Sequence, residues 1–466
     1  MFSALNSPDC HCSSSVVSHR HTEMGHDFVR DQFHSARGNI AIARDPLRPS
    51  SVPGLRIFEL ACCFAALASL VASPVVGTAA AAVFLGSVAV LAFLRPTQTL
   101  REVWLFLPLL ALPLLAMIST IWSDAPERTL RAALQMMLTM AASILICRRV
   151  SNDTLILMVF VAMGGVCALA LPSIPRVLAD GRPLLGPYAS KNAMAYAAHL
   201  LVALALAIVC TPRRSIWWRL AAGATIPMGL GLMYLAESAG AMLALAITLA
   251  TFPALLLIGR MNSIGRVVTI TVAVGSTALA LAFLPDLEAA AADFRQNVLH
   301  KDATLTGRSY LWDFADRLSQ ERPLLGHGYY AFWREGNLDA EGLWRYAGIA
   351  SRTGFNFHNT FVEMRVDLGW VGTAVLTLTC AAIASLGLVR QFTQPSVGLA
   401  FLLALTSCEL IRATAETSLF GPFSYYSLLL IATAVYAVRP SPAATQIPPR
   451  EQNVGRSEPF RTPRTV

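Results

Sequence analysis

Apolar runs of about 20 residues recur along this chain, and they constrain its fold more than any other feature. A helix needs about 20 apolar residues to cross roughly 30 Å of hydrocarbon. About twelve such runs occur, at 57–73, 75–94, 103–122, 130–147, 154–172, 192–210, 216–235, 238–258, 267–285, 367–388, 397–413 and 418–438. Only 14% of the 466 residues are charged, against about 25% in soluble domains. The sequence therefore predicts an all-α polytopic membrane protein with about 12 transmembrane helices.

The arginines of the short loops predict how the chain is oriented. With residue 1 inside, the inner loops hold Arg95, Arg101, Arg148, Arg149, Arg213, Arg214, Arg219, Arg260, Arg266 and Arg390. The positive-inside rule then places both termini in the cytoplasm and the long polar stretch 286–358 on the outer side. The net charge of +8 follows largely from these arginines and the tails, so no nucleic-acid partner is predicted.

Changes in composition divide the chain into five segments. The two ends lack apolar runs and are rich in polar residues or proline, which is typical of disorder. The predicted segments are a disordered cytoplasmic tail at 1–55, transmembrane helices 1–9 at 56–285, a large outer loop at 286–358, transmembrane helices 10–12 at 359–438 and a second disordered cytoplasmic tail at 439–466.

No metal site is predicted. Cys10 and Cys12 with scattered histidines match no usual four-ligand spacing. Asp313 and Asp316 lie one turn apart in a predicted helix and could share a cation, but pairing with a neighbouring Arg308 or Arg317 is the favoured interpretation.

The stretch "SRTGFNFHNTFVE" lies where the outer loop returns to apolar sequence, and it carries Arg352, His358, Asn359 and Glu363. An imidazole at an interface exchanges a proton near neutral pH, and a nearby carboxylate can orient it. His358 is therefore a candidate general base. The alternative is an interfacial histidine with satisfied ring nitrogens.

A second group of polar residues precedes the sixth apolar run. "DGRPLLGPYASKNAMA" brings Arg182, Lys191 and Asn192 to the outer membrane surface through a turn rich in glycine and proline. Lys191 is one of only two lysines in the chain. Arginine and lysine side chains here are candidates for binding phosphate, although basic residues at span ends often only extend to the interface.

Three segments resemble the O-antigen ligase and polymerase superfamily of bacterial inner-membrane glycan enzymes. "GRSYLWDFADRLSQERPLLGHGYYAFW" is similar to the family's Arg-x-x-x-Trp helix with its following Pro-x-x-Gly-x-Gly. "HNTFVEMRVDLGWVG" is similar to its His-Asn-x-x-x-Glu segment with two glycines, and "GPYASKN" is most like the succinoglycan-type exopolysaccharide polymerase branch.

The resemblance implies a GT-C-like glycosyltransferase architecture with one large periplasmic loop, in the bacterial inner membrane. It implies transfer of a glycan from undecaprenyl pyrophosphate to a hydroxyl of a glycan acceptor. The predicted catalytic residues are His358, Glu363 and Glu416, and the predicted phosphate-binding residues are Arg182, Lys191 and Arg308. Asn192, Arg352 and Asn359 are candidate donor or acceptor contacts. The outer loops contain no Asp-x-Asp motif, so neither a metal nor another cofactor is expected.

One departure concerns the eighth apolar run. Relatives often carry a serine followed by a basic residue there, whereas Ser238 is followed by Ala239 and Gly240. A phosphate contact is absent, or Lys191 replaces it.

The first hypothesis for function is polymerisation of lipid-linked repeat units of an exopolysaccharide. The alternative of the same class is an O-antigen ligase that transfers a lipid-linked glycan to lipid A core or another acceptor. The alternative of another class is a polysaccharide-related transporter or flippase, which would place polar residues near mid-membrane. The candidate partners are the lipid-linked oligosaccharide, the glycan acceptor, the lipid bilayer, and polysaccharide chain-length and export proteins.

Overall fold

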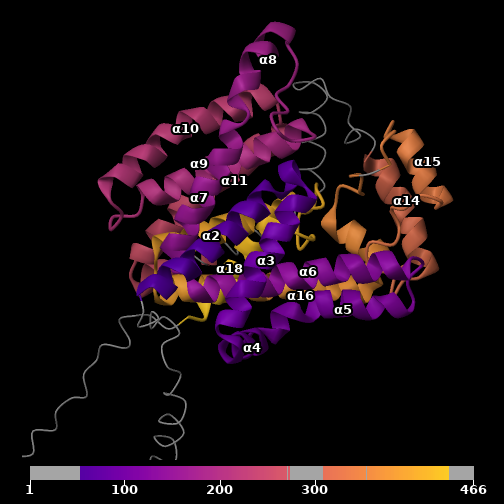
Figure 1. Cartoon of the computed structure of the whole chain (residues 1–466), viewed down its shortest axis with the longest axis horizontal. Coiled ribbons are helices and arrows are strands. Elements are labelled where there is room, and N and C mark those ends of the chain that lie inside the picture. Colours follow the sequence, from indigo (N-terminus) through magenta and orange to yellow (C-terminus); the bar gives the residue numbers. More distant parts are fainter. Residues whose placement is uncertain (1–52, 270, 273–307, 353, 440–466) are drawn as a thin grey trace, which may run out of the picture. The chain divides into compact units, whose positions relative to one another are not determined.

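The computed structural model describes residues 53–269, 271–272, 308–352 and 354–439, and this part of the chain is helical without strands (Figure 1). The α-helices are α2 Pro53–Val76, α3 Thr78–Leu94, α4 Pro96–Leu105, α5 Ala111–Ile118, α6 Pro126–Arg149, α7 Asn152–Ala168, α8 Ile174–Asp180, α9 Lys191–Val209, α10 Ile216–Ala236, α11 Ala239–Arg260, α14 Arg308–Glu321, α15 Leu338–Tyr346, α16 Thr360–Thr393, α17 Val397–Arg412 and α18 Tyr425–Ala437. Short 3₁₀ helices occupy Leu107–Leu110, Ser119–Ile121 and Leu171–Ser173.

Long apolar helices confirm the predicted polytopic membrane fold. Within the described residues, six helices are long and apolar enough to cross a membrane, or seven if α3 and α4, bent by 106°, form one broken span. Shorter helices occupy several other predicted spans. The number of about twelve stays a prediction, because most of the predicted span 267–285 and both tails lie outside the described residues.

Two predicted spans differ from single continuous helices. The run 103–122 is divided among α4, a 3₁₀ turn and α5, because Pro108 and Pro113 lack the N–H that a continuous helix needs. The run 367–388 belongs to the longer helix α16, which begins at Thr360 and is interrupted at Gly369. Gly369 has φ 65°, a conformation that favours glycine.

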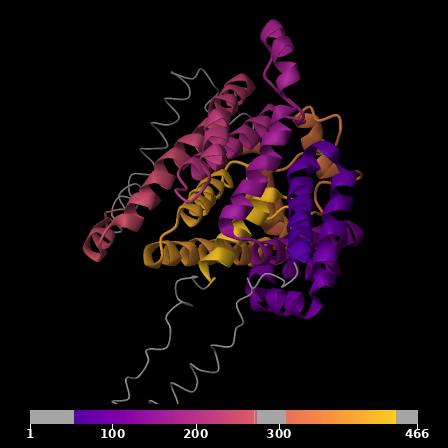
Figure 2. The same cartoon turned by 60° about the vertical axis from the view of Figure 1, so that its left-hand side comes forward.

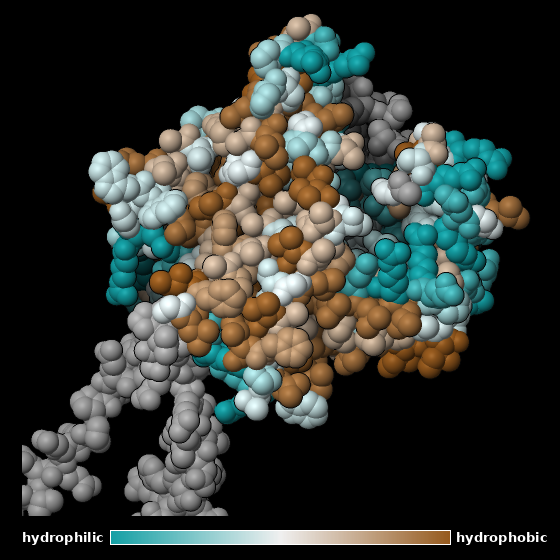
Figure 3. Space-filling view, in the orientation of Figure 1, coloured by the Kyte–Doolittle hydropathy of each residue, from teal (hydrophilic) through white to brown (hydrophobic). Residues whose placement is uncertain are grey.

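The helices enclose a buried core in which the C-terminal helices are central. α9 packs against α7, α10 and α11, while α18 packs against α6, α16 and α17. Every residue of α18 is buried, and Figure 2 shows this yellow helix among its neighbours. Hydrophobic side chains gather on the surface of the bundle, whereas hydrophilic ones gather over α14 and α15 (Figure 3). An apolar outer surface is what a bilayer requires of a bundle.

A second, smaller core lies between α14, α15 and the start of α16. One face of α14 is apolar, since Leu311, Ala315 and Leu318 are buried there with aromatic residues such as Trp344. The Trp312 indole N–H donates to the Phe357 carbonyl at 2.8 Å. This core therefore holds the backbone immediately before His358.

The predicted pairing on the polar face of α14 is wrong for Asp316. Asp316 pairs with Arg365 of α16 and not with Arg308 or Arg317. Arg317 instead lies over the Phe314 ring. The described residues hold no group of three or more potential metal ligands around Asp313 and Asp316 or elsewhere.

Candidate active site

His358 is held in a tight turn at the start of α16. Its φ of 52° is unusual for a residue other than glycine, and such a conformation persists only where its surroundings fix it. The backbone N–H of His358 donates to Asn356 Oδ1 at 2.8 Å. Asn359 Oδ1 caps α16 by accepting from the N–H groups of Phe361 and Val362. The turn therefore places the imidazole at the N-terminal end of α16.

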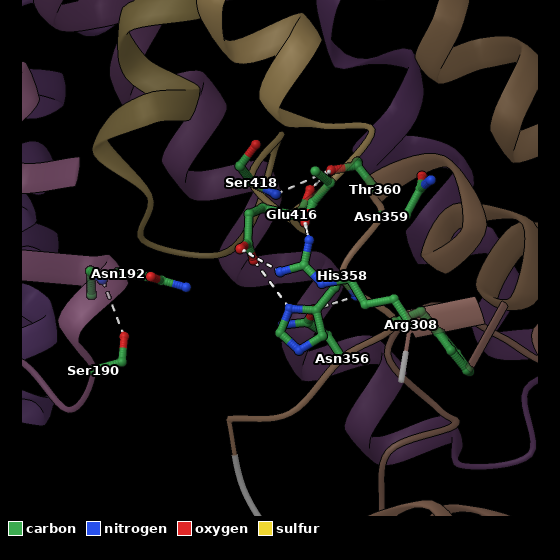
Figure 4. Close-up of polar contacts among 12 residues, drawn as sticks. Ser190, Asn192, Arg308, Asn356, His358, Asn359, Thr360, Glu416 and Ser418 are labelled. Carbon is green, nitrogen blue, oxygen red and sulfur yellow. Dashed lines mark hydrogen bonds and ion pairs between the residues drawn. The ribbon is translucent and has the colours of Figure 1, made fainter. Parts of the chain in front are cut away.

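His358, Glu416 and Arg308 form a continuous polar chain (Figure 4). His358 Nδ1 lies 3.1 Å from Glu416 Oε2, and Arg308 Nη2 lies 3.0 Å from Glu416 Oε1. Burial tends to raise the pKa of Glu416, but the hydrogen bond with His358 and the charge of Arg308 outweigh it and hold this pKa below its usual value. Glu416 is therefore ionised throughout the neutral range.

The contact with Glu416 uses one of the two nitrogens of the His358 imidazole. With Nδ1–H donating to the Glu416 carboxylate, Nε2 carries the lone pair, and Nε2 has no hydrogen-bond partner among the described residues. The His358 side chain is 28% exposed, so a substrate hydroxyl can reach it. The arrangement is that of a general base oriented by a carboxylate.

Glu363, predicted as a partner for the imidazole, binds elsewhere. Its Oε1 accepts from the Trp333 indole N–H at 2.9 Å and its Oε2 accepts from the Phe357 N–H at 2.8 Å. Glu363 thus braces the segment that carries His358. Glu363 therefore positions the turn, and Glu416 is the carboxylate that contacts the imidazole of His358.

The structure does not bring all predicted site residues together. Arg182 lies in the loop after α8 and Lys191 lies at the start of α9, and both side chains are exposed. Neither has an ion-pair partner in the described ranges. Asn192 accepts a hydrogen bond from Ser238 Oγ at 2.9 Å and stands apart from His358 (Figure 4). Their contacts to phosphate or sugar stay predictions.

The remaining predicted contacts, Arg352 and Asn359, have protein partners. Arg352 Nη2 lies 3.3 Å from Glu341 Oε2. Asn359 caps α16 with its Oδ1, and its Nδ2 donates to the Thr414 carbonyl at 3.0 Å. Both polar atoms of its side chain therefore bind protein groups. Asn359 therefore fixes the loop that carries Glu416, and its predicted contact with substrate stays untested.

A large cavity lies between helices of the bundle. Its volume is about 1040 Å³, and its walls come from α2, α3, α6, α9, α17 and α18. Leu130, Leu134 and Leu138 line it at helical spacing and are each about 40% exposed. The cavity thus combines an apolar wall with a few polar side chains.

Arg412 lines the same cavity and was missed by the sequence analysis. Its guanidinium carbon lies 3.8 Å from the centre of the Tyr196 ring and 4.5 Å from that of Tyr426, and it pairs with both oxygens of Glu409 at 3.1 Å. Its charge also helps to lower the pKa of Glu416. A signal was present, because Glu409 and Arg412 are charged residues one turn apart in a predicted span.

Two comparisons with known proteins match large parts of this chain. Residues 200–377, which include Arg308, His358 and Glu363, match the family described as O-antigen ligase. The chain is 28% identical over 344 residues to the exopolysaccharide production protein ExoQ of Rhizobium meliloti (strain 1021), covering 71% of this chain and 76% of the relative. The predicted resemblance to the O-antigen ligase and polymerase superfamily is confirmed. The chain is a multi-pass membrane protein whose residues 200–377 are similar to the O-antigen ligase family, and this similarity supports an enzyme.

Proposed function

We propose that this chain polymerises undecaprenyl-pyrophosphate-linked repeat units of an exopolysaccharide at the periplasmic face of the inner membrane. The observation that carries the proposal is that His358 Nε2 has no hydrogen-bond partner among the described residues, while Nδ1 contacts Glu416 and Glu416 contacts Arg308. The name of the relative ExoQ supports exopolysaccharide as the product class. The ligase alternative is favoured by the description of the matching family.

In the proposed reaction, His358 Nε2 accepts the proton of an acceptor sugar hydroxyl. The hydroxyl oxygen attacks the anomeric carbon of the donor, and the bond between that carbon and the pyrophosphate oxygen breaks. A new glycosidic bond forms and undecaprenyl pyrophosphate leaves. Glu416 stabilises the imidazolium that results, as a carboxylate does in other histidine bases.

The large apolar cavity is the proposed site of the polyprenyl chain. Leu130, Leu134 and Leu138 offer it an apolar wall, and burial of apolar surface contributes about 25 cal/mol per Å². Arg412 lies on the cavity wall close enough to influence Glu416. In this proposal Arg412 and Arg308 face the pyrophosphate, and Arg182 and Lys191 approach it from the loop before α9. Guanidinium and ammonium groups stabilise the leaving pyrophosphate without a metal ion.

Replacing any one of Arg182, Lys191 and Arg308 by alanine should lower turnover. A hydrogen bond to a charged group contributes about 1.5–3 kcal/mol, so each change should cost about 10- to 100-fold in rate. The measurement is polymer formed per unit time by membranes that contain equal amounts of each variant. Arg176→Ala, at an exposed arginine of α8, is the matched control and should leave the rate unchanged. Near-normal rates in all three variants would remove these cations from the proposed phosphate site.

The proposed orientation predicts that α15 is periplasmic. Leu338 is 85% exposed, so Leu338→Cys, in a chain whose native cysteines are replaced by alanine, should react with a membrane-impermeant thiol reagent in intact spheroplasts. Arg213→Cys, in the loop between α9 and α10, should react only after lysis. The reverse pattern of labelling would contradict the proposed orientation.

A deletion strain separates polymerase from ligase. Cells that lack the proposed polymerase should accumulate single lipid-linked repeat units and secrete no long exopolysaccharide, and the intact gene should restore both. A ligase would instead leave long lipid-linked polymer that is not transferred to its acceptor. Unchanged lipid-linked intermediates on the outer face would contradict both forms of the proposal.

A further inference from the structure

A second, small cavity lies between the segment that precedes His358, α6 and the loop after α17. Its volume is about 170 Å³, roughly the space of five or six water molecules and well below the 300–1,000 Å³ of sites for larger ligands. It is lined by ten residues, among them Trp333, Trp344, Phe355 and Tyr330. A cavity of this size has room for one six-membered sugar ring.

Aromatic rings form most of the apolar wall of this cavity. Trp333 contacts Trp344 and Phe355, with ring centres 6.1 Å and 5.2 Å apart. Aromatic faces carry negative charge density, which attracts the weakly positive C–H face of a pyranose. Trp344 is 2% exposed and its indole N–H has no acceptor in the described part of the chain. A sugar hydroxyl that reached this N–H would remove the cost of an unpaired donor.

The charged side chains of the cavity favour an anionic ligand. Arg128 and Arg352 both line it. Arg128 has no ion-pair partner within the residues that the structure describes, and Arg352 has a single contact with Glu341 at 3.3 Å. The one acidic residue of the wall, Glu363, already accepts a hydrogen bond on each oxygen. The guanidinium groups of Arg128 and Arg352 therefore line a space of the size of one sugar. A guanidinium group binds a carboxylate with two parallel hydrogen bonds.

The cavity is continuous with the turn that positions the general base. Asn356 lines the cavity and accepts from the His358 backbone N–H. Phe355 also lines it, and its ring centre lies 5.6 Å from that of His358. We infer that this cavity is the acceptor subsite and that it selects a pyranose bearing a carboxylate, held by Arg128 and Arg352 between the aromatic rings. The acceptor role rests on the proposed function, whereas the selectivity for an acidic sugar can be measured without turnover.

The test is saturation-transfer NMR on the purified full-length protein in nanodiscs. The two probes are cellobiouronic acid and cellobiose, which differ in one carboxylate. The acid should bind at least about ten-fold more tightly than the neutral sugar. Arg128→Gln and Arg352→Gln, both at exposed positions, should each lower the affinity for the acid toward that for cellobiose. Arg345→Gln, an exposed arginine of α15 outside the cavity, is the matched control and should keep the preference.

In the experiment without a competitor, three results would overturn the inference: no binding of either sugar at millimolar concentration, equal affinity for both sugars, or a preference that survives in both variants. Inorganic pyrophosphate is added as a competitor, because the same arginines could serve the phosphates of the donor. Displacement of the acid by micromolar pyrophosphate would assign them to the donor and overturn the inference. His358→Gln should bind the acid normally, so a failure of the proposed chemistry is distinguishable from a failure of this subsite.

Discussion

His358→Gln should lower turnover by about 10²- to 10⁴-fold, the usual contribution of a general base. Glutamine keeps polarity and approximate size, but its amide cannot accept a proton at neutral pH. The loss should fall on kcat with little change in donor affinity, because the change removes an interaction made in the transition state. The measurement is the rate of polymer formation, with membrane levels checked by immunoblot.

His358→Ala separates chemistry from packing in the same assay. If the imidazole acts as a base, the alanine and glutamine variants should lose activity to a similar extent. If His358→Gln makes polymer of normal amount and length, His358 has no catalytic part. His327 would not be a ready substitute, since its Nδ1 lies 3.0 Å from Asp124 Oδ2 and its Nε2 lies 3.2 Å from the Leu318 carbonyl oxygen.

Glu416→Gln should lower turnover by about 10²- to 10³-fold. The amide keeps the shape of the side chain, but it removes the charge that stabilises the imidazolium and can present an N–H to His358 Nδ1, which favours the wrong tautomer. The measurement is single-turnover transfer by the purified variant, because that rate reports the chemical step.

Glu363→Gln is the comparison for this prediction. Glu363 binds Trp333 and the Phe357 backbone but not the imidazole, so its replacement should act through the position of the turn. We therefore expect it to lower the melting temperature as well as the rate, while Glu416→Gln lowers mainly the rate. A Glu416→Gln enzyme with wild-type single-turnover kinetics would contradict the orienting role of Glu416.

The membrane fold could be predicted because the bilayer leaves few choices. A segment that crosses hydrocarbon must satisfy its backbone internally, so runs such as 130–147 and 192–210 predict helices from length and composition alone, as α6 and α9 confirm. The break of the run 103–122 was harder to predict. Proline is tolerated in some membrane helices, and indeed α10 continues through Pro227.

The candidate site was only partly predictable because its contacts join distant parts of the chain. The junction at 351–363 predicted His358 as a candidate base from local sequence. Arg308 and Glu416 are 108 residues apart, and no local periodicity links them. Only the packing of α14 against α16 and the loop after α17 shows that Arg308 also contacts the Glu416 carboxylate.

For Arg412, the sequence did contain a signal of a functional residue, and the prediction did not use it. Glu409 and Arg412 form a charged pair in an apolar run, and such residues in membrane segments usually serve function. The stacking of Arg412 between Tyr196 and Tyr426 beside a large cavity became visible only once three helices were placed together.

The most direct measurement is transfer by the purified protein in nanodiscs, supplied only with an undecaprenyl-pyrophosphate-linked oligosaccharide and excess EDTA. The account predicts longer glycans and one undecaprenyl pyrophosphate released for each new glycosidic bond, with both products lowered at least about 100-fold in His358→Gln. Two results would contradict the account. In the first, the wild-type protein transfers no glycan in EDTA and regains transfer when a divalent metal is added. In the second, wild type and His358→Gln transfer equally.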